Sequence, residues 1–339
     1  MSAFVDDIRG QGGALRELAG HADEVGALVD ELELGSFDRI VLSGMGGSHY
    51  AAYPAWLALV GRGLPAWWVD TAELLHDAAG LVGGRTLLWL TSQSGESAEI
   101  VELLRGLRAS SRPTVVGLTN TPESTLAEAA DHVVLLHAGD EQAVSTKTFV
   151  NTLGAFSLAV ATDRTEAVGG LGRAAAALDD WAGSLDAAVE RATALLDGPA
   201  GVVIVGRGRS LAAARAGALT IKEAAKTHAE ALGSGAFRHG PVELAGPGLA
   251  VIVLAGDARA ADLNRALAAD VAGYGSPVAW VGDGCPEGVP ALASPGVDSA
   301  FGRQVAEIAA LQACSVALAG LHGIEPGVFR FATKVTTVQ

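Results

Sequence analysis

Short apolar runs alternate with longer stretches of helical periodicity along most of the chain. The run at residues 86–90 is strongly apolar, and after it Ile100, Leu103, Leu104 and Leu107 recur at the spacing of one helix face. Further apolar runs lie at residues 39–42, 66–69, 114–118 and 133–136. Strands that alternate with helices in this way favour a parallel sheet with helices on both faces.

The same pattern restarts in the second half of the chain. A mostly helical span at about residues 151–196 is followed by apolar runs at 201–205, 249–254 and 278–281. Each half opens with a strand and a glycine-rich turn, so we expect a duplicated α/β fold. The expected parts are a helical segment at residues 1–36, a first domain at 37–165, a second domain at 166–325 and a tail at 326–339.

Two helices are expected in the second half. The first begins at Ser210, carries an apolar stripe that includes Leu211 and Ile221, and is expected to end at Gly233. The second is the uncharged stretch at residues 308–324. It falls slightly short of the roughly 20 residues that span a bilayer. We therefore expect it to be a buried core helix.

Composition restricts the partners that the chain can have. It has 339 residues and a formal net charge of −15. Nucleic acids and anionic membranes bind surfaces on which Lys and Arg cluster, so neither is expected as a partner of this acidic chain. Cys285 and Cys314 have no histidine at ligand spacing, which predicts neither a zinc site nor a disulfide framework, and we expect no metal ion. The first ten residues lack the apolar segment of a signal peptide, so a cytoplasmic protein is expected.

Polar side chains that suit a phosphate follow the strand at residues 86–90. Ser92, Gln93, Ser94 and Ser97 lie between that strand and the next helix. At a helix N-terminus, unpaired backbone N–H groups and the positive end of the helix dipole favour an anion, and hydroxyl groups add donors without adding charge. Helix capping alone needs only one serine. The sequence therefore predicts an anion site here.

Two further turns in the first half carry hydroxyl groups. Gly47 and Ser48 follow the first strand, in a turn that resembles half of a dinucleotide fingerprint. His49 stands where the third glycine would be, which argues against a nicotinamide cofactor. Ser145 opens another turn, and Lys147 could add a positive charge there. In the second half, residues 255–257 replace the serine-rich loop with a segment that lacks hydroxyls and presents an acid, so the anion site is expected in the first half only.

Groups suited to proton transfer lie later in the chain. Glu223 is a carboxylate on an expected helix, and His239 precedes a Gly-Pro turn. Separately, each is explained as a surface carboxylate or a turn residue, but together they could open a sugar ring and move a proton between C1 and C2. Lys334 lies in an alternating tail that could close over a pocket, where an amine can form a Schiff base with a keto sugar.

Together these motifs resemble the sugar isomerase (SIS) superfamily, in particular the tandem-SIS isomerase half of glucosamine-6-phosphate synthase and its stand-alone relatives. The resembling motifs are Ser92-Gln93-Ser94-Gly95-Glu96-Ser97, Ser145-Thr146-Lys147-Thr148-Phe149, Ile221-Lys222-Glu223 through His228-Ala229-Glu230-Ala231, Arg238-His239-Gly240-Pro241 and the Lys334 tail. They span about residues 40–339 in the family's order. The resemblance implies two tandem flavodoxin-like SIS domains, each a parallel five-stranded sheet with helices on both faces.

The resemblance also implies roles for individual residues. The sugar phosphate would be bound by Gly47, Ser48, Ser92, Gln93, Ser94 and Ser97, with Ser145 beside the sugar. Glu223 would shuttle the C1/C2 proton, His239 of the neighbouring subunit would assist ring opening, and Lys334 would approach the sugar carbonyl. It thus implies a homodimer at least, a small sugar phosphate as substrate and no cofactor.

The chain departs from the synthase pattern at several points. Thr220 stands where the synthase has a lysine three residues before the catalytic glutamate, and Ala236 replaces an acid that is common before the His-Gly-Pro turn. Glu243, just after that turn, could help select among the relatives. No N-terminal cysteine nucleophile or glutaminase domain is recognised, so we expect no release of ammonia from glutamine by this chain.

The leading hypothesis is an isomerase that acts on an amino sugar 6-phosphate and removes its amino group, like a glucosamine-6-phosphate deaminase or a fructosamine-phosphate deglycase. Alternatives are a non-deaminating aldose–ketose phosphate isomerase, including the phosphoglucose/phosphomannose type, and an ammonia-dependent synthase-like enzyme. A non-catalytic phosphosugar sensor is a further alternative. The acidic N-terminal segment offers no basic DNA-binding helix, which argues against a sensor that regulates transcription.

Overall fold

The computed structural model describes residues 2–107, 112–142 and 144–337. They form two compact units, each built around one parallel sheet, as expected. The five-stranded unit comprises Gly13–Glu141, Lys147–Gly172 and Phe331–Gln339. The four-stranded unit comprises Met1–Gly12, Gln142–Thr146 and Arg173–Arg330. Each unit therefore collects segments that are distant in the sequence.

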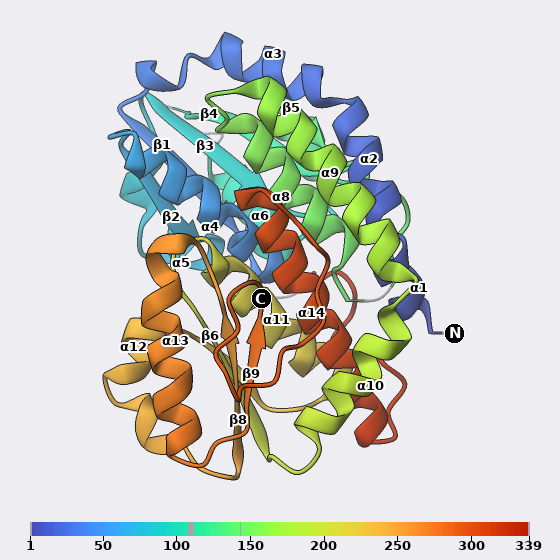
Figure 1. The fold of residues 1–339 in the computed structure, drawn as a ribbon. Helices are drawn as coiled ribbons and strands as arrows, with labels where there is room; N and C mark the ends of the chain where they lie inside the picture. The colour runs from blue at the N-terminus through green and yellow to red at the C-terminus, as the bar shows by residue number, and fades with distance from the viewer. Residues whose placement is uncertain (1, 108–111, 143, 338–339) are drawn as a thin grey trace. The chain divides into compact units, whose positions relative to one another are not determined.

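The sheet of the five-stranded unit is formed by the apolar runs of the first half. Its strands are β1 (Arg39–Gly44), β2 (Ala66–Asp70), β3 (Thr86–Thr91), β4 (Thr114–Thr119) and β5 (His132–Leu135). All of them pair in parallel, in the order β2-β1-β3-β4-β5 (Figure 1). The strands lie where the sequence predicts them.

Helices cover both faces of this sheet because successive strand residues point to opposite sides. The helices of this unit, with the two that cross its limits, are α2 (Gln11–Gly20), α3 (Ala22–Leu32), α4 (Gly46–Gly61), α5 (Thr71–His76), α6 (Ala98–Gly106), α7 (Thr125–Ala129), α8 (Lys147–Ala159) and α9 (Arg164–Ala182). Leu88 and Leu90 of β3 pack in one cluster with side chains of α5, α6 and α7. Trp89, between them, faces the other way and lies 5.8 Å from the ring of Phe156 in α8. On that side α4 packs against α8.

The sheet of the four-stranded unit has the same order without the last strand. Its strands are β6 (Gly201–Gly206), β7 (Ala229–Gly233), β8 (Leu249–Leu254) and β9 (Val278–Val281), in the order β7-β6-β8-β9. The expected five strands are therefore wrong for this half. Where a fifth strand would pair, the described chain makes only an isolated bridge between Trp280 and Ala291. Pro290 directly precedes Ala291, and proline has no N–H to extend a ladder.

The expected helix from Ser210 to Gly233 is also wrong. Helix α11 (Ser210–Ala225) ends because Lys226 takes a left-handed conformation, with φ of 55°. The chain then runs as β7 beside β6 before a short helix, α12 (Ser234–Arg238). Glu223 consequently lies in the last turn of α11, close to the point where the chain reverses.

The long apolar helix of the second half is confirmed as a core helix. The helices of the four-stranded unit that were not yet named are α1 (Ala3–Arg9), α10 (Leu185–Leu196), α13 (Ala258–Gly273) and α14 (Ala300–Leu321). With 22 residues, α14 begins earlier than expected and is long and apolar enough to span a membrane. Of its most apolar window, 83% is buried. It packs against α10 and α11.

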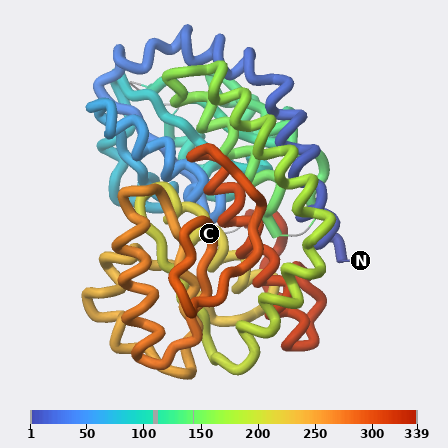
Figure 2. The backbone as a smooth tube through the Cα atoms, in the orientation of Figure 1, coloured from blue at the N-terminus to red at the C-terminus, as the bar shows by residue number. Residues whose placement is uncertain are grey.

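The chain after α14 is irregular. Residues 322–337 contain no helix or strand, and Figure 2 traces the backbone of this last part of the chain in red. Its final part, Phe331–Gln339, belongs to the five-stranded unit. Segments without secondary structure at a terminus are usually frayed unless side chains or hydrogen bonds hold them.

Candidate functional site

The strand order of the five-stranded unit creates a crevice position between β1 and β3. Gly44 at the end of β1 lies opposite Thr91 at the end of β3. Because β2 and β3 lie on opposite sides of β1, the helices that follow β1 and β3 leave toward opposite faces of the sheet. Such a switch point is where open parallel sheets bind ligands. Ser48 and the serine loop, residues 92–97, therefore follow neighbouring strands at one sheet edge, as expected.

Hydroxyl groups within the serine loop bond to one another and to its backbone. Ser92 Oγ accepts a hydrogen bond from the Gly95 N–H at 3.1 Å and lies 3.1 Å from Ser97 Oγ. The Glu96 N–H donates to Ser94 Oγ at 3.2 Å. Ser97 occupies the N-cap position of α6, yet its hydroxyl caps no backbone N–H group of that helix. Helix capping therefore does not account for these serines.

The loop is held against the turn that follows β4. Gly95 has φ of 67°, and a Cβ placed there would lie 2.1 Å from Ser124 Oγ, so only glycine fits. The Glu96 carboxylate accepts hydrogen bonds from both the backbone N–H and the hydroxyl of Thr125. The Gln93 carbonyl accepts from the Asn120 N–H at 3.0 Å. The loop is thus held in place by contacts within the protein, and such preorganisation lowers the entropy cost of binding a ligand.

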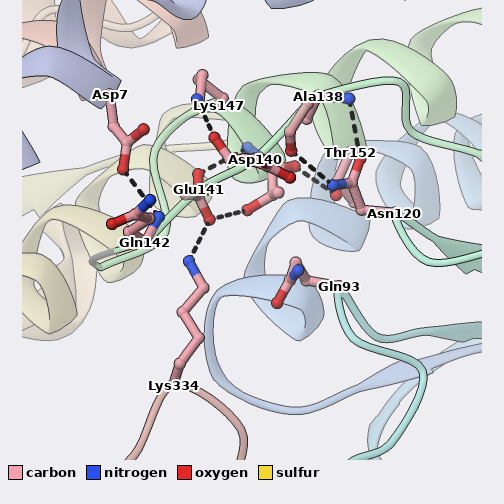
Figure 3. A network of polar contacts seen from close by, with 12 residues as sticks. Asp7, Gln93, Asn120, Ala138, Asp140, Glu141, Gln142, Lys147, Thr152 and Lys334 are labelled. Carbon is pink, nitrogen blue, oxygen red and sulfur yellow. Dashed lines mark hydrogen bonds and ion pairs between the residues drawn. The ribbon is translucent and has the colours of Figure 1, made fainter. Parts of the chain in front are cut away.

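The C-terminal tail is tied to the same unit at two points. The backbone N–H of Ala98, the first residue of α6, donates to the Thr336 carbonyl at 3.0 Å. Lys334 Nζ lies 2.9 Å from Glu141 Oε2, and Figure 3 shows its side chain extending from the tail to that carboxylate. These contacts explain why this tail is ordered, and they place the segment that carries Lys334 at the start of the helix after the serine loop.

Glu141 is a functional candidate that the sequence did not reveal. Its carboxylate is fully buried and accepts hydrogen bonds from Thr148, at 3.0 Å from the backbone N–H and 2.7 Å from the hydroxyl. Glu141 thereby both fixes the start of α8 and binds Lys334 of the tail. The only sequence signal is an acid seven residues before a threonine at a helix start.

The polar turn before α8 is divided between the two units. Ser145 is half-buried and Thr146 is buried, and both belong to the four-stranded unit. Lys147 begins α8 in the five-stranded unit, and its amine donates to the Asp140 carbonyl. That lysine is therefore engaged with the backbone of its own turn.

Glu223 and His239 both lie in the four-stranded unit. Glu223 is half-buried, and its carbonyl accepts a hydrogen bond from the Lys226 amine, which also donates to the Val328 carbonyl at 2.7 Å. Burial, then the charge of Arg330, lower the pKa of Lys226. Thr220, at the family's lysine position, is buried and donates its hydroxyl to the Ala216 carbonyl within its own helix.

His239 ends α12 as an exposed side chain. Its neighbour Arg238 forms an ion pair with Asp270 at 2.7 Å, which fixes the turn. Gly240 follows with φ of 122°, a conformation open to glycine. The imidazole thus projects from a fixed turn, and Glu243 is exposed one turn later.

The comparison with known proteins identifies the family. The model of the SIS domain family matches residues 33–162 and 199–280, which together make up more than half of the chain. The chain belongs to the SIS domain family. The two matched segments fall on the two sheets, so the tandem arrangement expected from the motifs is confirmed.

Individual SIS relatives are similar over different shares of the chain. The glutamine–fructose-6-phosphate aminotransferase (isomerizing) of Pyrococcus horikoshii is 33% identical over 234 residues, which cover 65% of this chain and 38% of the relative. The chain thus spans well under half of that protein. The C-terminal domain of glucosamine-fructose-6-phosphate aminotransferase from Francisella tularensis superposes with a TM-score of 0.83 at 21% identity, covering 97% of this chain and 98% of that domain. Glucosamine-6-phosphate deaminase from Thermotoga maritima gives 0.73 at 19% identity, covering 98% and 99%.

One group in the five-stranded unit has ligands that suit a metal ion. Ligand atoms of His21, Glu24 and His137 lie within 4.8 Å of one another. The two imidazole rings are stacked 3.7 Å apart and nearly parallel, so their nitrogen lone pairs lie in parallel planes and one ring would have to turn before both could bind one ion. The hydrogen bond with Glu24 raises the pKa of His21, whereas burial, then the charge of His21, lower the pKa of His137.

The SIS sheet of the four-stranded unit has a switch point of its own, between β6 and β8. Behind it lies Glu307 of α14, which is 3% exposed. Burial raises its pKa to about 7, although Ser210 Oγ donates to Oε1 at 2.7 Å and Gly256 and Arg303 oppose the shift. Its other oxygen, Oε2, has no partner in the described chain.

We expect Glu141→Gln to release the tail, because the neutral amide keeps an acceptor for Thr148 but loses the ion pair with Lys334. Hydrogen exchange of residues 331–337 should speed up by about tenfold or more, which corresponds to roughly 1.4 kcal/mol of local stability. Glu325→Gln, at an exposed position, is the control. Unchanged exchange of the tail in Glu141→Gln would show that the ion pair does not hold it.

Glu307 predicts a pH dependence of stability. A carboxyl group whose pKa is raised in the folded state stabilises the protein fully below the unfolded pKa and loses that contribution as pH rises through the folded pKa. The window here runs from the ordinary value of 4.5 to about 7. At 1.36 kcal/mol for each pKa unit, the loss amounts to about 3 kcal/mol.

The glutamine of Glu307→Gln does not ionise, so this variant should have a higher melting temperature than the wild type at pH 8. Much of that difference should disappear at pH 4.5. The control Glu325→Gln, at an exposed position, should have the melting temperature of the wild type at both pH values. Melting curves recorded at the two pH values test this. A Glu307→Gln difference that is the same at both would contradict the raised pKa.

Proposed function

We propose that this SIS protein isomerises a phosphorylated amino sugar by moving a proton between C1 and C2, with loss of the amino group as ammonia. The observation that carries this proposal is the hydrogen bond between Ala98 and Thr336. It holds the segment that bears Lys334 at the start of the helix that follows the serine loop. The serine loop could bind the phosphate, and the long side chain of Lys334 carries an amine on the same unit. This arrangement suits a sugar phosphate whose carbonyl lies several carbons from its phosphate.

The phosphate is proposed to bind at the switch point of the five-stranded unit. The proposed ligands are Gly47, Ser48, Ser92, Gln93, Ser94 and Ser97, with Ser145 beside the sugar. Half-burial of Ser94 and Ser97 leaves their hydroxyls accessible to a ligand. The start of α6 adds the positive end of a helix dipole, so a dianion can be held without a cluster of cationic side chains.

The chemistry proposed for the sugar is a sequence of proton transfers. His239 gives a proton to the ring oxygen while the O1 hydroxyl loses its own, which opens the ring to an aldehyde. Glu223 removes the C2 proton of the 2-amino aldose while the aldehyde oxygen O1 gains a proton, which gives an enaminol. Glu223 then returns its proton to C1 while the amino group loses one, so that C2 becomes an imine carbon. Water adds to this C=N bond, ammonia leaves, and the ketose phosphate remains. Lys334 is proposed to contact the oxygen on C1. Acids and bases suffice for every step.

A second candidate is the reverse reaction, in which ammonia and a ketose phosphate give the amino sugar phosphate. The 33% identity to an isomerizing aminotransferase supports it. The proton transfers are the same, so the direction depends on the concentrations of ammonia and sugar phosphates. Thr220, whose hydroxyl donates to the Ala216 carbonyl of its own helix, stands where the synthase has a lysine, so the chain departs from the synthase pattern at this point.

We further propose a cytoplasmic homodimer in which His239 acts on the substrate of the partner subunit. The exposure of this imidazole at the end of a fixed turn suits such a role. An exposed catalytic histidine that served only its own subunit would be open to water. The surface of a partner subunit would exclude that water from the histidine.

Glu223→Gln should lower the rate of ammonia release from glucosamine 6-phosphate by about 10²–10⁴-fold, because the amide cannot accept the C2 proton. Glu230→Gln, an exposed acid in the same unit, is the matched control and should keep its rate. Ammonia release is followed by a coupled assay, and the product is identified by NMR with glucosamine 6-phosphate, fructosamine 6-phosphate and fructose 6-phosphate as substrates.

Turnover of none of these substrates by the wild type would overturn the enzymatic assignment. If the sugar phosphates then still raised the melting temperature, a sensor would be the better description. Exchange of the C2 proton without ammonia release would instead favour the non-deaminating isomerase.

Mixing two inactive variants tests whether His239 is shared between subunits. If it is, Glu223→Gln mixed with His239→Asn forms heterodimers with one intact site, and random mixing of dimers should restore about a quarter of the wild-type rate. The two variants are combined after partial denaturation and refolding, beside each variant alone. A mixture as inactive as its parts would place both residues on one subunit.

A further inference from the structure

The loops at the second switch point, between β6 and β8, line a cavity of about 300 Å³ in the four-stranded unit. Three helices of 16 or more residues begin at its wall, since Ser210, Ala258 and Ala300 are the first residues of α11, α13 and α14. Each helix start adds the positive end of a dipole, although several of its first N–H groups already donate to the protein, as in the capping of α13 by Asp257 and of α14 by Ser299. The geometry of the backbone alone therefore favours an anion in this cavity.

Cationic side chains gather at the same wall. Arg209, Arg259 and Arg303 line the cavity, in a chain whose net charge is −15. Among the described residues, Arg209 and Arg259 have neither an ion pair nor a side-chain hydrogen bond. The one acid in the lining is Asp257, and its Oδ1 accepts hydrogen bonds from the backbone N–H groups of Arg259 and Ala260. Guanidinium groups bind phosphate through paired N–H donors, so these arginines suit a phosphate ester.

A buried acceptor at the cavity adds a second, independent sign of a ligand. Gln304 lines the cavity, is 6% exposed, and its Oε1 has no partner in the described chain, whereas its Nε2 donates to the Ala300 carbonyl. Buried polar atoms are rarely left unpaired, because the loss of their hydration is then uncompensated. A hydroxyl group of a ligand would supply the missing donor.

We propose that this cavity is a second ligand site, which binds a small phosphate monoester that carries hydroxyl groups. The arginines and helix starts hold the phosphate, and Gln304 accepts from the ligand's hydroxyls. The sequence pointed away from an anion here, because the loop after β8 has no hydroxyl and contains an acid. The arginines come from three distant parts of the chain and become neighbours only in the fold. This proposal does not rest on the reaction proposed above.

Calorimetric titration of the full chain with fructose 6-phosphate tests the proposal. The background is a Ser92→Ala, Ser97→Ala variant, which weakens the first phosphate site. One ligand should still bind per chain. Adding Arg209→Ala and Arg259→Ala should weaken this binding by at least about tenfold, since each charge-assisted hydrogen bond contributes roughly 1.5–3 kcal/mol. Arg265→Ala is the matched control, an arginine of α13 that pairs with Asp262 and does not line the cavity.

Inorganic phosphate is the second probe. It should bind at least about tenfold more weakly than fructose 6-phosphate, because it brings no alcohol hydroxyls to Gln304. Equal affinity for the two would overturn the role given to Gln304. Binding that is unchanged by the arginine substitutions, or absent from the serine variant altogether, would overturn the second site. Loss of turnover in the serine variant with binding intact would leave this proposal standing and bear only on the reaction.

Discussion

The reversal of strand order beside the first strand of each parallel sheet is the constraint on which the rest of the structure depends. In the order β2-β1-β3-β4-β5, the connections on the two sides of β1 must leave to opposite faces, so no helix covers the point where they part. The first loops after β1 and β3 meet there by necessity. Serines at these two places are thus brought together by topology, although 44 residues separate Ser48 from Ser92.

The tail illustrates how a segment without secondary structure becomes part of such a site. Two polar contacts hold it in place. The Thr336 carbonyl accepts from the first N–H group of α6, and the Lys334 amine pairs with the buried Glu141 carboxylate. The carboxylate of Glu141 is itself held by Thr148. A helix start, a loop and the tail are therefore coupled through one acid. The second switch point has the same strand order and also lies at helix starts, but it carries different side chains.

Sequence patterns predicted the parts of this molecule that depend on local periodicity. Strands β1 to β5 and the buried character of α14 follow from apolar runs alone. Strand β7 was missed because Ala229-Glu230-Ala231-Leu232 is made of helix-forming residues, and only pairing with β6 overrides that preference. Where a fifth strand would pair, Pro290 precedes the bridging Ala291 and removes one N–H from any ladder. Glu141 and the arginine cavity could not be predicted, because their partners lie far away in the sequence and are set by tertiary packing.

The serine loop has no cationic side chain, and this has a consequence for how fast a ligand arrives. Hydroxyls and backbone N–H groups act only at contact, whereas the chain's net charge of −15 acts over roughly 10 Å at ordinary ionic strength. A doubly charged phosphate ester that binds here as proposed would therefore be repelled during its approach and attracted only on arrival. Added salt weakens the long-range repulsion more than the hydrogen bonds made at contact. Moderate salt would accordingly accelerate the proposed association, the reverse of the behaviour of proteins that steer anions with a basic surface.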